Sequence, residues 1–341
     1  MNKVLKRTLI ALLSLILVFI VFAYFFVGNY FYNFALSPQS KWESVLDFKM
    51  PDIPVEEQNK ILGSKCDPKD LRKMVFERER QSLIRVGQAQ KWMKTTLYED
   101  VYIKSFDGLK LHAYKVPNGG SNKWCIIAHG YMASGLDLIV EARAFHELGF
   151  NLLMLDLRGH GKSEGSYIGM GWHDRLDVKK WIEYIVNENG NSSIILYGVS
   201  MGAATVMMVL GEQLPSNVRL AIEDCGYNLI KEEVEYLVNF MFGLPAWPIV
   251  SAANLITKLR AGFFLGDGNC VEQLKKNKLP VLFIHGDSDT FVPTSILEKL
   301  FKASNGPKEK LIIENASHAK SLVMDFDLYW DTIKSFLDKY M

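Results

Sequence analysis

Residues 194–210 place a serine between two apolar runs, and this arrangement restricts the fold more than any other feature of the chain. Residues 194–197 have strand character, Gly198-Val199-Ser200-Met201-Gly202 follows, and residues 203–210 have the character of a buried helix. The pattern G-x-S-x-G between a strand and a helix predicts a sharp turn that exposes the serine hydroxyl at the helix N-terminus. A Cβ at either glycine would crowd this strained turn. The sequence therefore predicts that Ser200 is a nucleophile.

From residue 101 onward, stretches with strand character alternate with amphipathic stretches. Residues 101–104 and 109–116 alternate in polarity around Asp107-Gly108, which predicts a hairpin. The strands expected after it are 124–128, 151–155, 193–197, 218–222, 281–284 and 310–313, and the other expected helices are 138–148, 174–188, 293–303 and 321–339. An antiparallel start followed by this alternation predicts an α/β fold, with a mostly parallel sheet and helices on both faces.

The N-terminus carries an uncharged apolar run over residues 8–27, after three basic residues within residues 1–7. At about 1.5 Å per residue, a helix of this length crosses a hydrocarbon core of about 30 Å. The aromatic residues 30–32 are expected at the membrane interface, and the first basic residue after the run is Lys41. This asymmetry predicts a single-pass protein of the cell membrane, with residues 1–7 cytoplasmic and the catalytic domain extracytoplasmic.

A cleaved signal peptide is the alternative for this run. Residues 35–37 include small residues spaced for cleavage. The run is longer than the apolar part of a usual signal peptide, which favours an uncleaved signal anchor. Residues 38–100 are polar and predicted to be mostly helical, with a helix start at Asp67-Pro68, and they form either a stalk or a helical layer on the main domain.

Residues 226–279 interrupt the alternation of strands and helices, and we expect them to form a helical cap over the sheet. Residues 236–257 carry no charge, so taken alone they also fit a second membrane span. Two prolines and a glycine within this run argue against a span, because helix breakers at mid-depth leave backbone groups unsatisfied in lipid. The main domain is then expected over residues 101–225 and 280–341.

A nucleophilic serine needs a base, and its usual partner is a histidine that a carboxylate orients. Of the 7 histidines, His285 and His318 follow Ser200 in the chain, as the order Ser, acid, His of such serine turns requires. His285 falls at the end of a predicted strand, whereas His318 lies in a loop between the last strand and the last helix. Loops at the C-terminal ends of strands are where open α/β sheets place their sites, which favours His318 as the base.

Several motifs follow one another between residues 100 and 341. They are His129-Gly130-Tyr131, the D-L-R-G-H-G-K-S stretch at 156–163, the serine turn at 198–202, the H-G-D-S-D-T-F-V-P stretch at 285–293, and Ser317-His318. In this order they resemble the α/β-hydrolases of the serine peptidase, monoglyceride lipase and acyl esterase type with an inserted cap. The resemblance implies an α/β-hydrolase fold with an eight-stranded, mostly parallel sheet, and a serine hydrolase activity.

The resemblance also implies roles for individual residues around Ser200. In this family the aspartate before the V-P pair is the triad acid, which here is Asp289, and it would orient His318 and stabilise its imidazolium. Asp287 is interpreted as a turn residue, and Asp224 remains an alternative acid. The backbone N–H groups of Tyr131 and Met201 would form the oxyanion hole.

Other motif residues are interpreted as structural. His129 is expected to bond within its own loop, and Arg158 and His160 to support the loop beside the site, since a buried charge there needs internal partners. Residues 169–173 are glycine-rich but lack the Lys-Ser/Thr pair of a phosphate-binding loop, so we interpret them as a turn.

Composition argues against several other kinds of protein. The net charge of +1 gives no electrostatic footprint for nucleic acid. The 4 cysteines include no C-x-x-C pair, and no cluster has metal-ligand spacing, so neither a metal nor a cofactor is expected. Cys225 and Cys270 flank the predicted cap and either pair or remain free thiols, of which free thiols are favoured.

These observations predict a membrane-anchored serine hydrolase that cleaves an ester or related acyl bond through an acyl-enzyme. An apolar or lipid-like acyl substrate is expected to contact Tyr131 and the cap residues Leu237, Phe240, Met241 and Trp247. An extracytoplasmic serine peptidase or aminopeptidase is the nearest enzymatic alternative, although the sequence shows no clear amine-binding carboxylate. Transfer of the acyl group to another acceptor, and a non-catalytic binding protein of the same fold, are further alternatives.

Overall fold

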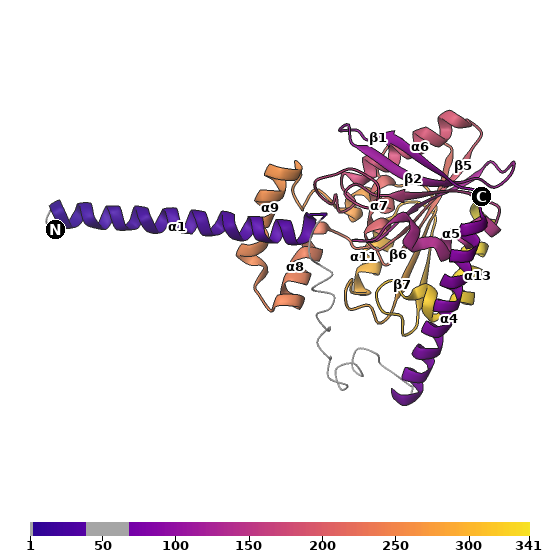
Figure 1. The fold of residues 1–341 in the computed structure, drawn as a ribbon. Helices are drawn as coiled ribbons and strands as arrows, with labels where there is room; N and C mark the ends of the chain where they lie inside the picture. Colours follow the sequence, from indigo (N-terminus) through magenta and orange to yellow (C-terminus); the bar gives the residue numbers. More distant parts are fainter. Residues whose placement is uncertain (1–2, 39–67) are drawn as a thin grey trace.

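The computed structural model of the chain describes residues 3–38 and 68–341 (Figure 1). Most of the predicted helical segment before residue 68, with Lys41 and Cys66, lies outside the described residues. The described residues form an eight-stranded sheet with helices on both faces, which confirms the predicted fold class. A long helix, α1 (Lys3–Leu36), projects from this body.

The sheet is parallel except at one edge. Its strands are β1 (Glu99–Lys104), β2 (Lys110–Val116), β3 (Lys123–Ala128), β4 (Asn151–Asp156), β5 (Ser193–Val199), β6 (Val218–Asp224), β7 (Val281–Gly286) and β8 (Lys308–Ile313). They follow the order β1-β2-β4-β3-β5-β6-β7-β8, in which β2 pairs antiparallel with both β1 and β4. Every residue of β4 and β7 is buried, because inner parallel strands are covered on both faces. The carboxyl ends of β5 to β8 therefore meet at one edge.

Helices cover the two faces of the sheet and bury two separate hydrophobic cores. The helices on one face are α6 (Asp174–Glu188), α7 (Met201–Val209), α10 (Cys270–Leu274) and α11 (Ser295–Ala303). The other face carries α5 (Ile139–Glu147), which follows a 3-10 turn at Gly135–Leu138, and α13 (Phe326–Tyr340). All residues of α7 are buried, since its sequence is apolar all round.

α4 (Pro68–Thr95) forms a layer on the main body rather than a stalk. It packs beside α5 and α12 (Ser321–Met324), and its residue Met93 joins the core under α5 and α13. The guanidinium of Arg85 lies 4.1 Å from the centre of the Phe326 ring, which adds a cation–π contact.

The prediction of one helix over residues 321–339 is wrong, because the structure divides this stretch into α12 and α13. Asp325 leaves the helical conformation between them (φ −145°, ψ 83°). Its carboxylate accepts a hydrogen bond of 3.1 Å from the backbone N–H of Leu328 and so caps α13.

α8 (Ile230–Phe242) and α9 (Ala246–Ala261), which we call the cap helices, occupy the segment predicted as a cap. Gly243 ends α8 in the left-handed conformation with φ 62°, where a side chain would be strained. The uncharged run 236–257 is therefore shared between two helices. Of the helices in the part of the chain that the structure describes, α1 is the one long and apolar enough to cross a membrane.

α1 is one continuous helix that extends beyond the span predicted at residues 8–27. Its last turns pack beside α9, where Figure 1 shows the two helices side by side. Tyr32 is only 2% exposed and belongs to the core, whereas Tyr30 is 55% exposed, so the position of residues 30–32 at a membrane interface stays a prediction.

Candidate active site

Ser200 lies on a strained turn at the junction of β5 and α7. Its backbone has φ 56° and ψ −117°, a conformation that costs a non-glycine residue about 1–3 kcal/mol. The Ser200 N–H donates to the carbonyl oxygen of Asp224 at the end of β6, over 2.8 Å, which holds the turn against the sheet. Met201 is the first residue of α7, so its N–H has no partner within the helix.

The two glycines of the turn are required by close backbone contacts. A Cβ on Gly202 would lie 2.0 Å from the carbonyl oxygen of Ala128, at the end of β3, and a Cβ on Gly198 would lie 2.3 Å from the carbonyl oxygen of Gly202. Real Cβ atoms do not approach backbone so closely, and backbone cannot move aside as a flexible side chain can.

We expect the substitution Gly202→Ala to lower the free energy of unfolding by about 3 kcal/mol, because it overpacks the turn against β3. Chemical denaturation of the purified protein in detergent measures this loss. Gly190→Ala is the matched control, since a Cβ at Gly190 meets no atom of the described segments within 4 Å. Equal midpoints for the two variants would contradict the account of the turn.

The structure brings together Ser200, His318 and Asp289 from three different loops. Ser200 Oγ lies 2.8 Å from His318 Nε2, and His318 Nδ1 lies 2.8 Å from Asp289 Oδ2. With the proton on Nδ1, the ring donates to the carboxylate and accepts from the serine hydroxyl. This is the spatial arrangement of a nucleophile, a base and an orienting acid.

Asp289 is held as a carboxylate. Burial by itself would raise the pKa of Asp289, but hydrogen bonds and charge interactions with His285 and His318 lower it to about 2. Its Oδ1 also accepts from the backbone N–H groups of Phe291 and Val292, each over 2.9 Å, which fixes the orientation of the carboxylate.

The two alternative acids have other partners. Asp287 Oδ1 accepts from the backbone N–H of Asn315 over 2.7 Å and so supports the turn. Asp224 accepts from Ser321 Oγ over 3.0 Å and from the Tyr329 hydroxyl over 3.1 Å, so it connects β6 to α12 and α13. Asp289 is the carboxylate in hydrogen-bond contact with His318.

Two buried histidines tie the loop after β3 to the loop after β4. His129 Nε2 accepts from the backbone N–H of Leu157 over 3.0 Å, and His160 Nε2 accepts from that of Met132 over 3.2 Å. Burial lowers the pKa of His160 to about 3, so its ring is neutral and Nε2 is free to accept. These bonds fix the backbone next to Tyr131, where the sequence predicts an oxyanion-hole donor.

Arg158 is a structural residue with internal partners. Its Nε lies 2.7 Å from Asp177 Oδ2, and its Nη1 lies 3.0 Å from Asp107 Oδ2 and 2.8 Å from the Tyr167 hydroxyl. The guanidinium is fully buried and its charge is balanced within the fold, so it is not available to a substrate.

A small cavity of about 50 Å³ lies beside Ser200. Of the residues predicted around the site, Tyr131, Met201 and Leu237 line it. Residues that the sequence did not single out complete the wall: Ala35, Met170, Tyr227, Glu233, Val234, Phe291 and Val292. Apart from Glu233 and the Ser200 and tyrosine hydroxyls, this lining is apolar.

The structure does not bring the other predicted substrate contacts to this cavity. α8 faces the cavity with the two turns that carry Glu233 and Leu237, and Phe240 and Met241 lie one turn further along. Trp247 follows the turn between the cap helices and is 77% exposed. These three residues therefore do not line the cavity, and their contact with a substrate stays a prediction.

Glu233 is the acidic residue of the cavity wall, and sequence reasoning missed it. It is 3% exposed and lines the cavity, and among the residues that the structure describes neither of its carboxyl oxygens has a hydrogen-bond partner. Burial, with the nearby charge of Asp289, raises the pKa of Glu233 to about 8. In the sequence it stands between Lys231, Glu232 and Glu235, a pattern typical of a solvated helix face, so nothing there distinguished it.

The raised pKa of Glu233 makes stability depend on pH. An unfolded glutamate loses its proton near pH 4.5, whereas folded Glu233 keeps its proton up to about pH 8. The stability contribution of this residue therefore falls as pH rises from 4.5 to 8. We expect Glu233→Gln to stabilise the protein by on the order of 3 kcal/mol at pH 8 and by far less at pH 5.

Melting temperatures of wild type and Glu233→Gln at pH 5 and pH 8 test this expectation. Glu232→Gln is the matched control, because Glu232 is an exposed neighbour on the same helix. A wild-type-to-variant difference that is the same at both pH values would contradict a buried, protonated Glu233.

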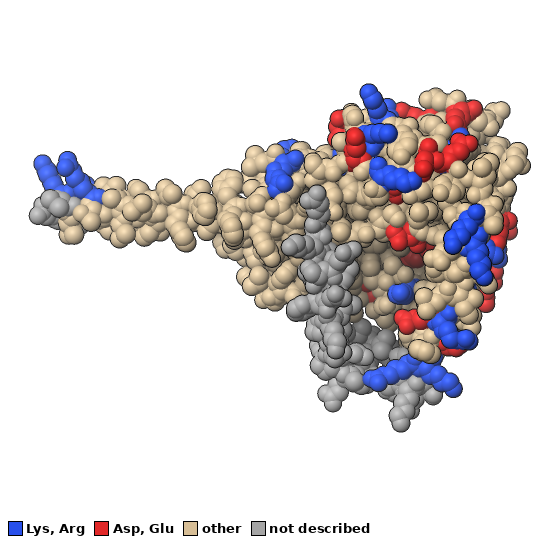
Figure 2. All heavy atoms as spheres, in the orientation of Figure 1, with Lys and Arg blue, Asp and Glu red and all other residues tan. Residues whose placement is uncertain are grey.

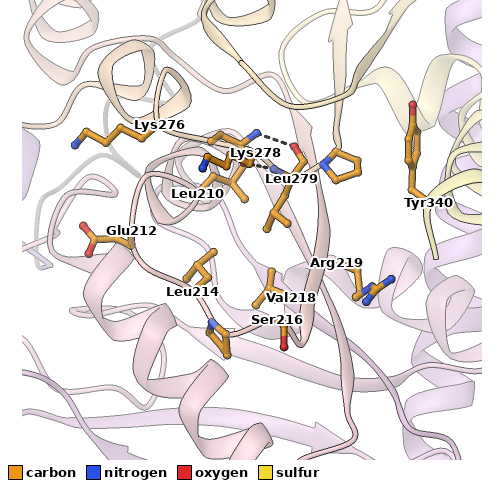
Figure 3. A pocket seen from close by; sticks show the side chains of 13 residues that line it. Leu210, Glu212, Leu214, Ser216, Val218, Arg219, Lys276, Lys278, Leu279 and Tyr340 are labelled. Carbon is orange, nitrogen blue, oxygen red and sulfur yellow. Dashed lines mark hydrogen bonds between the residues drawn. The ribbon is translucent and has the colours of Figure 1, made fainter.

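A larger cavity of about 500 Å³ lies at the opposite edge of the sheet, where β6 and β7 begin (Figure 3). Leu214, Val218 and Leu279 point into it, and it holds none of the predicted site residues. Since open α/β sheets bind ligands beyond the carboxyl ends of their strands, the smaller cavity is the candidate active site.

The cysteines of the described segments, Cys125, Cys225 and Cys270, are buried free thiols. Ligand atoms of Cys225, Asp289 and His318 lie within 4.8 Å of one another, a grouping the sequence did not predict. His318 and Asp289 are already bonded to each other, and burial raises the pKa of the Cys225 thiol well above its usual value. The three therefore do not form a preorganised cation site.

A serine on a strand-to-helix turn, with a histidine and an aspartate on later loops of a mostly parallel sheet, defines a protein of the α/β-hydrolase type. Solved structures share this fold. The esterase Pf2001 of Pyrococcus furiosus superimposes with a TM-score of 0.60 at 22% identity, covering 82% of this chain and 96% of that one. The esterase EaEST of Exiguobacterium antarcticum gives 0.53 at 17% identity, covering 70% of this chain and 100% of that one.

Sequence relatives agree with the fold. The family model described as "Serine aminopeptidase, S33" matches residues 120–243. The protein YqkD of Bacillus subtilis is 31% identical over 237 residues, which cover 69% of this chain and 78% of YqkD. The α/β-hydrolase domain-containing protein WAV2 of Arabidopsis thaliana is 26% identical over 254 residues, covering 72% of this chain and 80% of WAV2. The chain belongs to the α/β-hydrolase superfamily.

Proposed function

We propose that this protein is a membrane-anchored serine hydrolase that cleaves an acyl ester through an acyl-enzyme intermediate. The observation that carries the proposal is the continuous hydrogen-bonded line from Ser200 through His318 to Asp289. The likeness in fold to two esterases agrees with it.

In this mechanism Ser200 Oγ attacks the ester carbonyl while His318 Nε2 takes its proton. Asp289, held as a carboxylate, stabilises the imidazolium that forms. The backbone N–H groups of Met201 and Tyr131 would donate to the oxyanion. His318 then returns the proton to the leaving alcohol, and a water molecule activated by the same ring hydrolyses the acyl-enzyme.

The apolar wall of the cavity favours an acyl group without charge. Leu237, Val234 and Phe291 surround the space beside Ser200, and these three side chains offer no partner to a charged acyl group that loses its hydration there. Apolar surface buried on binding would contribute about 25 cal/mol per Å².

The N-terminal helix α1 supplies the proposed membrane anchor. It has a mean hydropathy of 3.0 over its most apolar window, none of which is buried in the protein. The basic residues before the apolar run support a cytoplasmic N-terminus and a catalytic domain on the outer side of the cell membrane.

Glu233 favours an aminopeptidase as the second candidate function. The Glu233 carboxyl group has no hydrogen-bond partner among the described residues and lies beside Ser200, so its ionised form would be suited to accept hydrogen bonds from the ammonium group of a peptide. The family model that matches residues 120–243 is described as a serine aminopeptidase, which agrees with this alternative.

A substrate panel tests the ester proposal. We expect kcat/KM for p-nitrophenyl esters to exceed that for aminoacyl p-nitroanilides by on the order of 10³-fold, since an apolar cavity does not solvate an ammonium group. Glu233→Gln and Glu232→Gln should affect ester turnover to similar, small extents.

The aminopeptidase alternative predicts a different outcome of the same panel. Anilides would then be the better substrates, and Glu233→Gln would lower their kcat/KM far more than Glu232→Gln does. That pair of results would replace the ester proposal with the peptidase one.

A further inference from the structure

The end of α1 differs from the rest of the helix in its surroundings. Most residues in the first two thirds of the helix are exposed within the part of the chain that the structure describes. Tyr32 and Leu36 near its end are 2% and 1% exposed and belong to the core of the catalytic body. The same helix therefore has an apolar length outside the body and a last section built into it (Figure 1).

This last section is fitted closely to cap helix α9. A Cβ on Gly28 would lie 2.6 Å from the carbonyl oxygen of Ala252, so the two backbones touch where α1 enters the body. Arg260 of α9 donates to Asn29 Oδ1 over 2.8 Å and to Asn33 Oδ1 over 2.7 Å. Its guanidinium also lies 4.2 Å from the centre of the Tyr32 ring.

Cap helix α8 contacts the same section through aromatic rings. Phe242, at the end of α8, packs edge-to-face against Phe31 and Phe34, with ring centres 5.6 and 5.3 Å apart. The two cap helices therefore flank the last turns of α1.

The final residues of α1 reach the candidate active site itself. The Tyr131 hydroxyl donates to the carbonyl oxygen of Ala35 over 2.8 Å, and the Ile168 N–H donates to that of Leu36 over 2.7 Å. Ala35 lines the cavity beside Ser200, together with Leu237 of α8. The wall of the cavity thus includes a residue of the helix proposed to cross the membrane.

Lys258 and Arg260 lie in the last turn of α9, but over residues 236–257 the cap helices beside the free length of α1 carry no charge. They lie between that length and the sheet (Figure 1), and Figure 2 shows the charged side chains gathered mainly over the sheet end of the molecule. The turn between the cap helices exposes Phe242, Leu244 and Trp247, by 37%, 40% and 77%. An exposed tryptophan with apolar neighbours, on the side of the body from which α1 projects, is typical of a segment that lies at the interface of a bilayer.

We propose that the last turns of α1 are part of the acyl-binding site, and that the substrate is an acyl ester resident in the bilayer whose chain reaches Ser200 between α1 and α8. This inference rests on the proposed function. It adds that the N-terminal helix stays attached to the mature protein. Cleavage at residues 35–37, the signal-peptide alternative, would remove Ala35 from the cavity wall and, with it, the carbonyl oxygen that accepts from the Tyr131 hydroxyl.

The experiment uses the full chain reconstituted in phosphatidylcholine vesicles, with two fluorogenic esters. One is water-soluble 4-methylumbelliferyl butyrate, and the other is 4-methylumbelliferyl oleate dissolved in the bilayer. Ala35→Phe narrows the space beside α1, so we expect it to lower oleate turnover by about tenfold or more and butyrate turnover much less. Wild-type oleate turnover should follow the mole fraction of the ester in the bilayer and not its bulk concentration.

Ala11→Phe is the matched control, since it makes the same change on the free length of α1 and should leave both rates as in wild type. Ala35→Val, a smaller change, gives the result if Ala35→Phe does not fold. Equal effects of the Ala35 variants on both esters, or an active mature protein that mass spectrometry shows to lack residues 1–35, would overturn the inference. Labelling of Ser200 by a small fluorophosphonate in the same vesicles reports the proposed function separately.

Discussion

Ser200→Ala should reduce kcat for p-nitrophenyl butyrate by about 10⁴-fold or more, because no other group takes the place of the attacking oxygen. The variant should fold as wild type does. It loses the hydrogen bond from the Ser200 hydroxyl to His318, but alanine keeps the backbone N–H that donates to the carbonyl oxygen of Asp224 and holds the strained turn. Steady-state kinetics and a melting temperature on the same preparation measure both parts of the expectation.

Ser317→Ala is the matched control for this substitution. Ser317 is exposed and lies next to His318 in the chain. Its variant therefore tests whether the loss of any hydroxyl near the base is enough to abolish activity. Ser317→Ala should keep most of the activity. Retention of butyrate turnover by Ser200→Ala would remove Ser200 as the nucleophile and, with it, the proposed mechanism.

Asp289→Asn should lower kcat by on the order of 10³- to 10⁴-fold at neutral pH. The amide has nearly the shape of the carboxylate, and its oxygen is still able to accept from Phe291 and Val292. It carries no charge, however, and so stabilises neither the required tautomer of His318 nor the imidazolium. The loss should therefore appear in kcat with little change in KM.

Two further variants separate Asp289 from the other acids. Asp287→Asn removes a carboxylate just after β7, where Asp287 accepts from Asn315. Asp224→Asn removes one at the end of β6, where Asp224 accepts from Ser321 and Tyr329. We expect both to retain most of kcat. A larger kcat loss for Asp224→Asn than for Asp289→Asn would assign the acid to the end of β6.

The lowered pKa of Asp289 sets the pH below which its carboxylate no longer stabilises the fold. Since its pKa in the fold is about 2 and a free aspartate titrates near 3.8, the stabilisation by its ionised form is present above pH 3.8 and is lost as pH falls towards 2. At neutral pH the wild-type Asp289 is fully ionised. The difference in activity between wild type and Asp289→Asn at that pH therefore measures the loss of its charge.

The parts of the fold that follow from local pattern were predicted well. The buried strands around Ser200 are continuous apolar runs, and the hairpin at Asp107-Gly108 has a strong turn signal, so both were visible in the sequence. Residues 321–339 form a nearly continuous amphipathic stretch, and the break at Asp325 depends on a capping bond that the pattern does not reveal.

Ser200 and His318 were predictable because they follow strand ends in a fixed chain order, and the resemblance to the α/β-hydrolases pointed to Asp289. The structure brings Ser200, His318 and Asp289 within hydrogen-bond distance, while their catalytic roles stay a prediction. The cavity wall was not predictable, because Ala35 and Glu233 approach Ser200 only through the packing of α1 and α8. An uncharged cap sequence likewise does not say which apolar residues face inward, and Trp247 faces outward.

The most direct test of the central claim is covalent labelling of the full-length protein with a fluorophosphonate, followed by peptide mass spectrometry. The probe reacts with a serine only where a base activates the hydroxyl and donors hold the developing oxyanion. The account predicts one phosphonate per chain, on Ser200, and loss of labelling in His318→Ala. Folded protein that stays unlabelled, or that carries the label on another residue, would contradict it.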